Sequence, residues 1–376
     1  VHPCLLALSV VFADSLMELM EGKTSCKKLL SLVLFSFVLS FCLFVSFRQY
    51  GTPKPEQNSF QPCAQIAPIE NKSTLPKTKH EITVLLWTWP FGKHFNFRNC
   101  SELYTIPDCR FTVNRTLLRK ANAVIVHHRD VFRNPKELTK ATRIPSQRWI
   151  WLNLESPSHS PNLRAMDNIF NLTMSYRRDS DIFSPYGELQ ILEQPQPFSI
   201  PPKSKLVAWV VSNWQARSHR VKYYQELKQH ITVDVYGQHH QPLAPDRLLP
   251  TLAQYKFYLA FENSRHEDYI TEKVWRNALS AGTVPVVLGP PRDNYERFLP
   301  PDAFIHVDDF ASAQDLARYL LELSEDAERY KRYFEWRQWL KPVVVSGWAI
   351  RLCRACHFLQ TEAQYHMVTK LSKWFL

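Results

Sequence analysis

The chain has 376 residues, which is room for two domains of the usual size of about 150 residues. Apolar residues make up 45% of it, which argues against a mostly disordered chain and against a polytopic membrane protein. The 46 Lys and Arg against 35 Asp and Glu give a net charge of +11, which favours an anionic partner: nucleic acid, phospholipid headgroups or a phosphate-bearing small molecule. No repeat or heptad period is visible, so solenoids and coiled coils are not expected.

The first distinct segment is the apolar stretch at residues 29–47, which contains no charge and no proline. A helix of this length just spans a thin bilayer, so we interpret it as a transmembrane signal-anchor, with residues 1–28 as a cytosolic tail. A buried core helix and a cleaved signal peptide are the alternatives, but no A-x-A cleavage site follows. Residues 1–16, which precede Met17, are hypothesised to be untranslated.

Four N-glycosylation sequons follow the apolar stretch, at Asn71, Asn99, Asn114 and Asn171. Because all four lie on the same side of it, they indicate a lumenal body and a type II orientation. Residues 48–80 contain five prolines among polar residues without apolar periodicity, which is typical of a stem.

From residue 81 onward, strand-like and helical patterns alternate in two series separated by a proline-rich break at 195–202. This alternation predicts two parallel sheets in two α/β domains that face a cleft, with domain boundaries at 81–200 and 201–345 and a C-terminal tail at 346–376. The strands are expected at 81–87, 123–128, 148–155, 205–212, 231–237, 255–263, 284–289 and 304–310, and the helices at 219–229, 271–281 and 313–323.

The cysteines after the stem suggest a covalent link between distant parts of the chain. Cys100/Cys109 and Cys353/Cys356 could form a Cys₄ zinc site, but an oxidising lumen favours disulfides that tie the tail to the first domain. Cys63 is left over, as a free thiol or as an intermolecular bridge in a homodimer.

Two strand ends carry candidate chemistry, since ligands of open α/β sheets gather at the carboxyl ends of strands. One delivers Glu155 immediately after an apolar run, although an ordinary surface acid would give the same pattern. At the other, Lys273 opens a helix, where a bound anion would offset its unfavourable interaction with the macrodipole; the alternative is a Lys solvated by Glu272 and Asp268. Arg220, at another strand-to-helix turn, could supply a second cation for a diphosphate.

Two further patterns are weaker indications of a metal. Asp179-Ser-Asp181 is a D-x-D pattern, which often arises by chance, and we expect it to be structural. The adjacent His127 and His128 would point to opposite faces of a strand, so we expect one in the core and one facing the cleft. The sequence predicts neither a metal site nor a required cofactor.

Several longer motifs resemble those of animal α-1,3-fucosyltransferases, the Lewis-type enzymes of glycosyltransferase family 10. The similarity runs from about residue 82 to 376 and covers a donor half and an acceptor half. The motifs are WTWPFG at 87–92, HHR at 127–129, LESP at 154–157, YRRDSD at 176–181, VVSNW at 210–214, FYLAFENS at 257–264, DYITEK at 268–273 and GTVPVVLG at 282–289.

The resemblance implies a GT-B fold of two Rossmann-like domains and assigns roles residue by residue. Glu155 would be the catalytic base, and Arg220 and Lys273 would hold the diphosphate of GDP. Lys93, which replaces a Gln of close relatives, and Arg129 would contact the acceptor. The bridges would be Cys100–Cys353 and Cys109–Cys356. The positions that would line the donor site are Tyr186, Val210, Ser212, Asn213, Tyr258, Asn263, Tyr269 and Glu272.

The function that the resemblance implies is an inverting transfer of L-fucose from GDP-β-L-fucose to the 3-hydroxyl of GlcNAc in type 2 chains. Glu155 would accept the hydroxyl proton while the cations stabilise the GDP leaving group. The expected partners are GDP-fucose and N-acetyllactosamine-bearing glycoproteins and glycolipids at the Golgi membrane, with no nucleic acid, and Mn²⁺ would be at most stimulatory. The alternatives are a core or protein-directed fucosyltransferase and a catalytically silent glycan-binding protein.

Overall fold

The computed structural model describes residues 81–97 and 100–376. The predicted tail, anchor and stem, together with Cys63, Asn71 and Asn99, lie outside the described residues. Within the described ranges no helix has both the length and the apolar character needed to cross a membrane.

The first sheet has six parallel strands in the order β2-β1-β3-β4-β5-β6. Its central strands are apolar on both faces, as is typical of parallel sheets that are covered on both sides. In β4, for example, Trp149, Ile150, Trp151 and Leu152 are all fully buried. The strands are β1 (Ile82–Leu86), β2 (Cys109–Thr112), β3 (Ala123–His127), β4 (Arg148–Asn153), β5 (Leu172–Ser175) and β6 (Ile182–Phe183).

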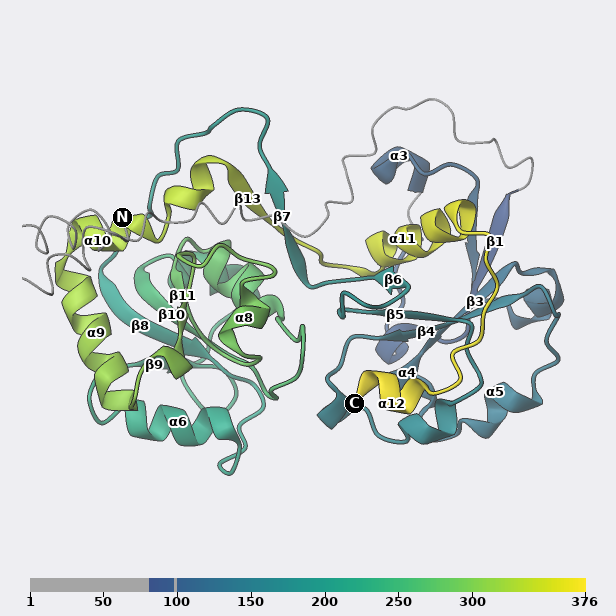
Figure 1. The fold of residues 1–376 in the computed structure, drawn as a ribbon, viewed down its shortest axis with the longest axis horizontal. Coiled ribbons are helices and arrows are strands. Elements are labelled where there is room, and N and C mark those ends of the chain that lie inside the picture. Colours follow the sequence, from purple (N-terminus) through teal and green to yellow (C-terminus); the bar gives the residue numbers. More distant parts are fainter. Residues whose placement is uncertain (1–80, 98–99) are drawn as a thin grey trace, which may run out of the picture. The chain divides into compact units, whose positions relative to one another are not determined.

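The second sheet has five parallel strands in the order β12-β11-β10-β8-β9. Helices α6 (His219–Leu227) and α9 (Ala313–Glu325) pack side by side against one of its faces, through residues such as Val221 and Leu320 (Figure 1). The strands are β8 (Lys205–Val210), β9 (Asp234–Tyr236), β10 (Tyr255–Phe261), β11 (Val284–Leu288) and β12 (Ile305–His306).

The short helices mostly form the connections between strands. Around the first sheet they are η1 (Pro90–Gly92), α3 (Cys100–Tyr104), η2 (Arg115–Lys120), α4 (His128–Val131), α5 (Lys136–Lys140), η3 (Pro157–His159) and η4 (Leu163–Met166). Around the second they are η5 (Pro245–Arg247), α7 (Leu248–Leu252), η6 (Lys273–Leu279), α8 (Arg292–Tyr295), η7 (Val307–Asp309), α10 (Ala327–Arg332) and η8 (Glu335–Gln338).

The end of the chain packs on the first sheet, after β13 (Leu340–Val344) pairs antiparallel with β7 (Gly187–Ile191). Helix α11 (Trp348–Thr361) covers one face of that sheet through Leu352 and Ala355. Helix α12 (Leu371–Phe375) covers the other face, where Phe375 is fully buried. Both faces of the first sheet are therefore covered in part by the last thirty or so residues of the chain.

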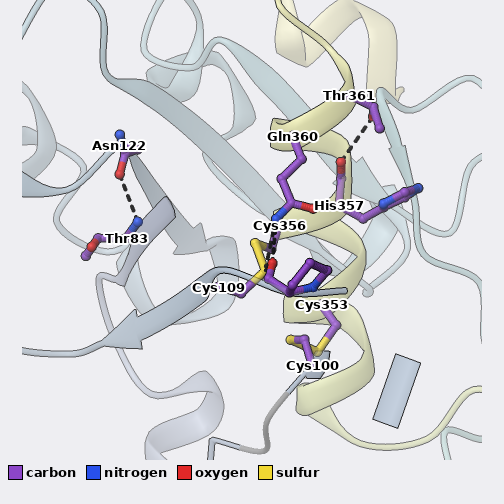
Figure 2. Close-up of a disulfide and its surroundings, with 10 residues drawn as sticks. Thr83, Cys100, Cys109, Asn122, Cys353, Cys356, His357, Gln360 and Thr361 are labelled. Atoms are coloured by element: carbon purple, nitrogen blue, oxygen red, sulfur yellow. Dashed lines mark hydrogen bonds between the residues drawn. A yellow bond between two sulfur atoms is a disulfide. The ribbon is translucent and has the colours of Figure 1, made fainter. Parts of the chain in front are cut away.

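Two disulfides fix α11 to the first sheet, as Figure 2 shows. Cys100 pairs with Cys353 and Cys109 with Cys356, which is the pairing that the resemblance implied. The four thiols are consumed by these bonds, so the zinc alternative is wrong. Near them, the Gln360 amide donates to the Pro107 carbonyl and so adds a polar contact between α11 and the segment before β2 (Figure 2).

The structure corrects some expected elements. Residues 304–310 form only the two-residue strand β12 before η7 begins, because the His306 ring accepts from the Asp308 N–H and turns the chain. The helix expected at 271–281 is η6, a π-helix. Strands β2, β5, β6, β7 and β13 were not expected from the sequence, because they are short or pair with partners far along the chain.

Candidate active site

Glu155 lies two residues beyond the end of β4, in a loop shaped by Asn153. The buried Asn153 amide nitrogen donates to Ser160 Oγ at 2.8 Å and to the Glu155 carbonyl at 3.3 Å, while its oxygen accepts from the Glu155 N–H at 3.3 Å. The Glu155 side chain is only partly buried. Among the described residues, no donor is within hydrogen-bond distance of its carboxylate, so both of its oxygens can accept a proton from a ligand.

Three tyrosines gather beside this carboxylate. Tyr186 donates its hydroxyl to the Leu154 carbonyl at 2.5 Å, and its ring centroid lies 6.5 Å from that of Tyr176 and 6.4 Å from that of Tyr269. Burial, reinforced by nearby carboxylates including Glu155, raises the pKa of each of the three hydroxyls well above its usual value. The three tyrosines are therefore neutral, and their aromatic rings lie beside Glu155 without adding charge.

A buried ion pair occupies the carboxyl end of β10. Glu262 is 1% exposed and accepts from the Thr271 N–H at 2.8 Å, from Thr271 Oγ at 2.9 Å and from Lys273 Nζ at 2.9 Å. Lys273 also donates to Thr271 Oγ at 2.8 Å and contacts Glu272 at 3.4 Å. Burial would lower the pKa of Lys273, but the two carboxylates outweigh it and raise that pKa above its ordinary value.

This arrangement corrects the alternative of a Lys273 solvated by Glu272 and Asp268. The ammonium is mostly buried and its closest carboxylate is Glu262, while Asp268 instead accepts from the Asn294 amide and from the Arg178 N–H. The reason is topological: η6 packs against β10, which brings Glu262, the residue directly after that strand, closer to the ammonium than Glu272 is.

Arg220, in the first turn of α6, is 5% exposed and has only backbone partners in the described chain. Its guanidinium donates to the Asn213 carbonyl at 2.6 Å and to the Phe261 carbonyl at 3.5 Å, and its Nε has no partner among the described residues. Burial lowers the pKa of this guanidinium and Glu262 opposes that shift, so Arg220 lies within electrostatic range of the ion pair. A buried cation without a hydrogen-bonded carboxylate is suited to bind an anion.

The other predicted donor-site residues surround these charges. Tyr258 is fully buried on β10, its hydroxyl accepts from the Asn277 amide at 2.9 Å, and burial raises its pKa to about 12. Asn263 is half-buried immediately after Glu262, and its oxygen accepts from Ser264 Oγ at 2.6 Å. Ser212 and Asn213 are exposed just beyond β8, whose last residue is Val210.

The two predicted acceptor residues are both exposed, on segments joined by Asp130. Lys93 follows η1, and Arg129 is on α4 with its guanidinium carbon 5.6 Å from the Phe132 ring centroid. Asp130 accepts from the Phe91 N–H at 3.1 Å and from His127 Nδ1 at 2.7 Å, which ties the η1 loop to the end of β3. This contact was not predicted, because it joins residues 39 positions apart.

The expectation that one of the two adjacent histidines faces the cleft was wrong. His127 is 0% exposed and His128 is 1% exposed. His128 Nε2 lies 3.0 Å from the Pro161 carbonyl and its Nδ1 accepts from the Trp151 indole at 3.2 Å. The rings find separate buried partners because the strand ends at His127 and α4 begins at His128.

Asp179 and Asp181 are held by protein partners rather than pointing at a common ion. Asp179 accepts from Arg177 Nε at 2.8 Å and Nη2 at 2.7 Å, and from the Trp374 indole at 3.0 Å. Asp181 accepts from the Thr173 N–H at 2.7 Å and lies 3.1 Å from His366. No group of three or more metal-ligating side chains occurs in the described part of the chain.

The two described sequons differ in accessibility. Asn114 is exposed and its oxygen accepts from the Thr116 N–H at 3.1 Å. Asn171 is 1% exposed, its oxygen accepts from the Trp149 N–H at 2.8 Å and its amide nitrogen donates to the His366 carbonyl at 2.9 Å. A glycan on Asn171 would therefore require the segment around His366 to lie elsewhere.

Comparison with known proteins decides the family. The model described as "Fucosyltransferase, N-terminal" matches residues 79–187, and that described as "Glycosyltransferase family 10 (fucosyltransferase) C-term" matches residues 200–374. The 3-galactosyl-N-acetylglucosaminide 4-alpha-L-fucosyltransferase FUT3 of Pongo pygmaeus is 49% identical over 93% of this chain and 96% of its own. The chain belongs to glycosyltransferase family 10. The expectation of a glycosyltransferase of the fucosyltransferase class is thus confirmed.

Another relative is named for a different linkage, and a solved structure shares the fold. The 4-galactosyl-N-acetylglucosaminide 3-alpha-L-fucosyltransferase FUT6 of Homo sapiens is 56% identical over 78% of this chain and 82% of its own. A crystal structure of an α1,3-fucosyltransferase with GDP-fucose aligns with a TM-score of 0.51 at 17% identity, over 78% of this chain and 94% of that one. This likeness supports the GT-B-like fold.

Sequence reasoning missed part of the buried network. It quoted Glu262 within a motif but gave it no role, and it did not single out Thr271 or Tyr176. The strand end that carries Glu262 stood out by the same signal as Glu155, a carboxylate directly after an apolar strand, but the chemistry there was assigned to Lys273.

Proposed function

We propose that this family 10 enzyme transfers L-fucose from GDP-β-L-fucose to the 3-hydroxyl of GlcNAc in type 2 chains, with inversion and with Glu155 as the base. The observation that carries the proposal is the Glu155 carboxylate. It receives no hydrogen bond from the described residues and lies beside Tyr186 and Tyr269, near the buried charges at the end of β10. A carboxylate in that state is free to accept the proton of an incoming hydroxyl.

The chemistry needs one base and a stabilised leaving group. In a single displacement the acceptor oxygen attacks C1 of fucose from the face opposite the departing GDP, so the β-linked donor gives an α-linked product. As the C1–O bond to GDP breaks, the fucosyl group gains oxocarbenium character and Glu155 takes the hydroxyl proton. General base catalysis of this kind typically supplies about 10²–10⁴-fold.

The donor proposal rests on the charges at the end of β10. Arg220 and Lys273 are both mostly buried cations, and electrostatic stabilisation of a leaving diphosphate is strongest where water is excluded. The solved structure of similar fold is described as containing GDP-fucose, which agrees with this donor. Since these cations can supply the positive charge, we propose transfer without a required metal, with Mn²⁺ at most stimulatory.

The acceptor proposal rests on Arg129. The resemblance associates Arg after the His pair with type 2 enzymes and Trp with type 1 activity, and the structure has Arg129 exposed on α4 near the η1 loop that carries Lys93. The names of the relatives include both kinds of enzyme, FUT3 acting on the 3-galactosyl and FUT6 on the 4-galactosyl acceptor. We also propose a Golgi membrane location, with the catalytic part in the lumen and glycoproteins and glycolipids as acceptors.

The test is a panel of acceptors incubated with GDP-fucose and the full chain. Galβ1-4GlcNAc, its sialylated form, Galβ1-3GlcNAc and a glycopeptide with a core chitobiose would be compared by kcat/KM, and the products analysed by NMR for linkage and anomeric configuration. We expect α1,3-linked product and a preference for the first two acceptors. A better rate with Galβ1-3GlcNAc would contradict the type 2 proposal, and glycopeptide-only activity would support a core enzyme instead.

A further inference from the structure

Glu262 is the most deeply buried acid in the site, yet the proposed reaction gives it no task. Its carboxylate is 1% exposed and has four close contacts with Thr271 and Lys273, all between 2.8 and 2.9 Å. Its backbone is also fixed, because the Glu262 N–H donates to the Leu288 carbonyl at 2.7 Å. A buried acid is costly to keep unless it is paired, so its position beside a proposed diphosphate site calls for a reason.

The charge count around Lys273 supplies that reason. Its ammonium faces Glu262 at 2.9 Å and Glu272 at 3.4 Å, and its remaining close partner, Thr271 Oγ, is neutral. The three donors of the ammonium therefore already have protein acceptors. Arg220 differs, since within the described chain it donates only to backbone carbonyls and keeps an unpartnered Nε.

We propose that Glu262 is a positioning residue that holds Lys273 and offsets its charge, so that Arg220, which donates to no carboxylate in the described chain, supplies the unpaired positive charge for the diphosphate and GDP is not bound too tightly. This inference rests on the proposed GDP-fucose donor. The Lys273–Glu262 pair then keeps the ammonium in a fixed position with its charge balanced by the carboxylate.

The proposed benefit follows from the reaction cycle. Substrate and product both contain the GDP diphosphate, so positive charge that binds all states equally lowers KM without raising kcat and slows the release of GDP. A fixed carboxylate next to the cation weakens this uniform binding. It also keeps the ammonium aligned for the moment when charge develops on the leaving group.

The test is a double-mutant cycle on GDP affinity, measured by calorimetry with the full chain. Glu262→Gln keeps the shape of the side chain but removes its charge. GDP should then bind about tenfold more tightly, since one nearby charge shifts such equilibria by about one to three powers of ten. KM for GDP-fucose should fall, while kcat should not rise. Lys273→Met should weaken GDP binding by at least about tenfold. The double variant should return to within about threefold of the wild-type affinity, because the pair as a whole is neutral.

A merely structural Glu262 predicts the opposite pattern, with weaker GDP binding, a raised KM and a lower melting temperature in Glu262→Gln. That result, or unchanged GDP affinity, would overturn the inference. Should Glu262→Gln fail to fold, the double variant decides, because replacing both members of a buried pair is usually tolerated. If the double variant then bound GDP as weakly as Lys273→Met does, the proposal would be contradicted.

Glu188→Gln is the matched control, because Glu188 pairs with Arg354 at 2.9 Å and has no assigned role in the site. We expect its GDP affinity to equal that of the wild type. Wild-type protein that does not bind GDP would contradict the proposed donor itself and this inference with it, whereas wild-type binding with an unresponsive Glu262→Gln would contradict the inference alone.

Discussion

His128 shows how burial fixes the protonation state of a single side chain. With Nδ1 accepting from the Trp151 indole, the ring proton must be on Nε2, where it is donated to the Pro161 carbonyl. A second proton would have to be placed on Nδ1, pointing at the indole N–H. Burial accordingly lowers the pKa of His128 from 6.5 to about 4, against the opposing effect of the Pro161 carbonyl.

This lowered pKa predicts a loss of stability in mild acid. Between pH 6.5 and about 4 the unfolded chain binds a proton at this position that the folded chain does not, so the free energy of unfolding should fall as the pH falls. The expected loss from this residue is about 2 kcal/mol at pH 5. Urea unfolding of the wild type and of His128→Asn at pH 7 and pH 5 measures it, and equal pH slopes in the two proteins would contradict the assignment.

Asp179 and Asp181 illustrate a motif whose meaning depends on its neighbours. Their carboxylates are engaged by Arg177, Trp374, Thr173 and His366, which fits a structural role in joining β5 to the C-terminal segment. Binding an ion would cost each carboxylate these hydrogen bonds, so the contacts oppose a metal-binding role.

We therefore expect fucose transfer to persist in excess EDTA after dialysis, with at least about half of the untreated rate, because Arg220 and Lys273 can stabilise the leaving group without an ion. Asp181→Asn should lower the melting temperature and leave KM for the donor nearly unchanged. Near-complete loss of activity that Mn²⁺ restores in the wild type but not in Asp181→Asn would instead establish a D-x-D metal site.

At the scale of elements, the two disulfides act together on α11. Each closes a long loop, with sequence separations of 253 and 247, but once one bridge is in place the second closes only the short ring through Cys100–Cys109 and Cys353–Cys356. In the loop-entropy model a short ring of this kind is worth about 3 kcal/mol and a loop of some 250 residues about 5 kcal/mol.

The two bridges should consequently be strongly non-additive. Replacing Cys100 and Cys353 together by Ala should cost about 3 kcal/mol, and so should replacing Cys109 and Cys356, whereas replacing all four should cost about 8 kcal/mol and release α11. Chemical unfolding without reductant measures these differences. A four-cysteine variant whose loss equals the sum of the two smaller losses would show that the bridges act independently.

The elements that could be predicted are those whose own sequence decides them. Strands β3, β4 and β10 are long apolar runs, and α9 has an apolar face with a Ser312 cap, so local pattern suffices. Strands β7 and β13 could not be found in this way, because their pairing joins residues about 150 positions apart. Local pattern also does not reveal the contact between Glu262 and Lys273, because it exists only after η6 has packed beside β10.

At the scale of the whole molecule, the chain crosses between its two sheets more than once. It leaves the first sheet after β6, forms the second and returns through β13 to place α11 and α12 on the first. Contacts link the loops at the two sheet ends: Ser156 Oγ lies 2.7 Å from Ser264 Oγ, and Ser158 Oγ 2.6 Å from His266 Nε2. The loop that carries Glu155 is thereby joined to the loop after Glu262.

Fucose transfer by this enzyme depends, in our proposal, on one carboxylate, Glu155, for the proton transfer and on the charges at the end of β10 for holding the donor. Glu155→Gln separates these roles, because the amide keeps the shape of the side chain but cannot take the proton. We expect its kcat on N-acetyllactosamine with GDP-fucose to fall by at least about 10²-fold while the calorimetric affinity for GDP stays within about threefold of the wild type. A variant that keeps near-normal kcat would contradict the role of Glu155 directly.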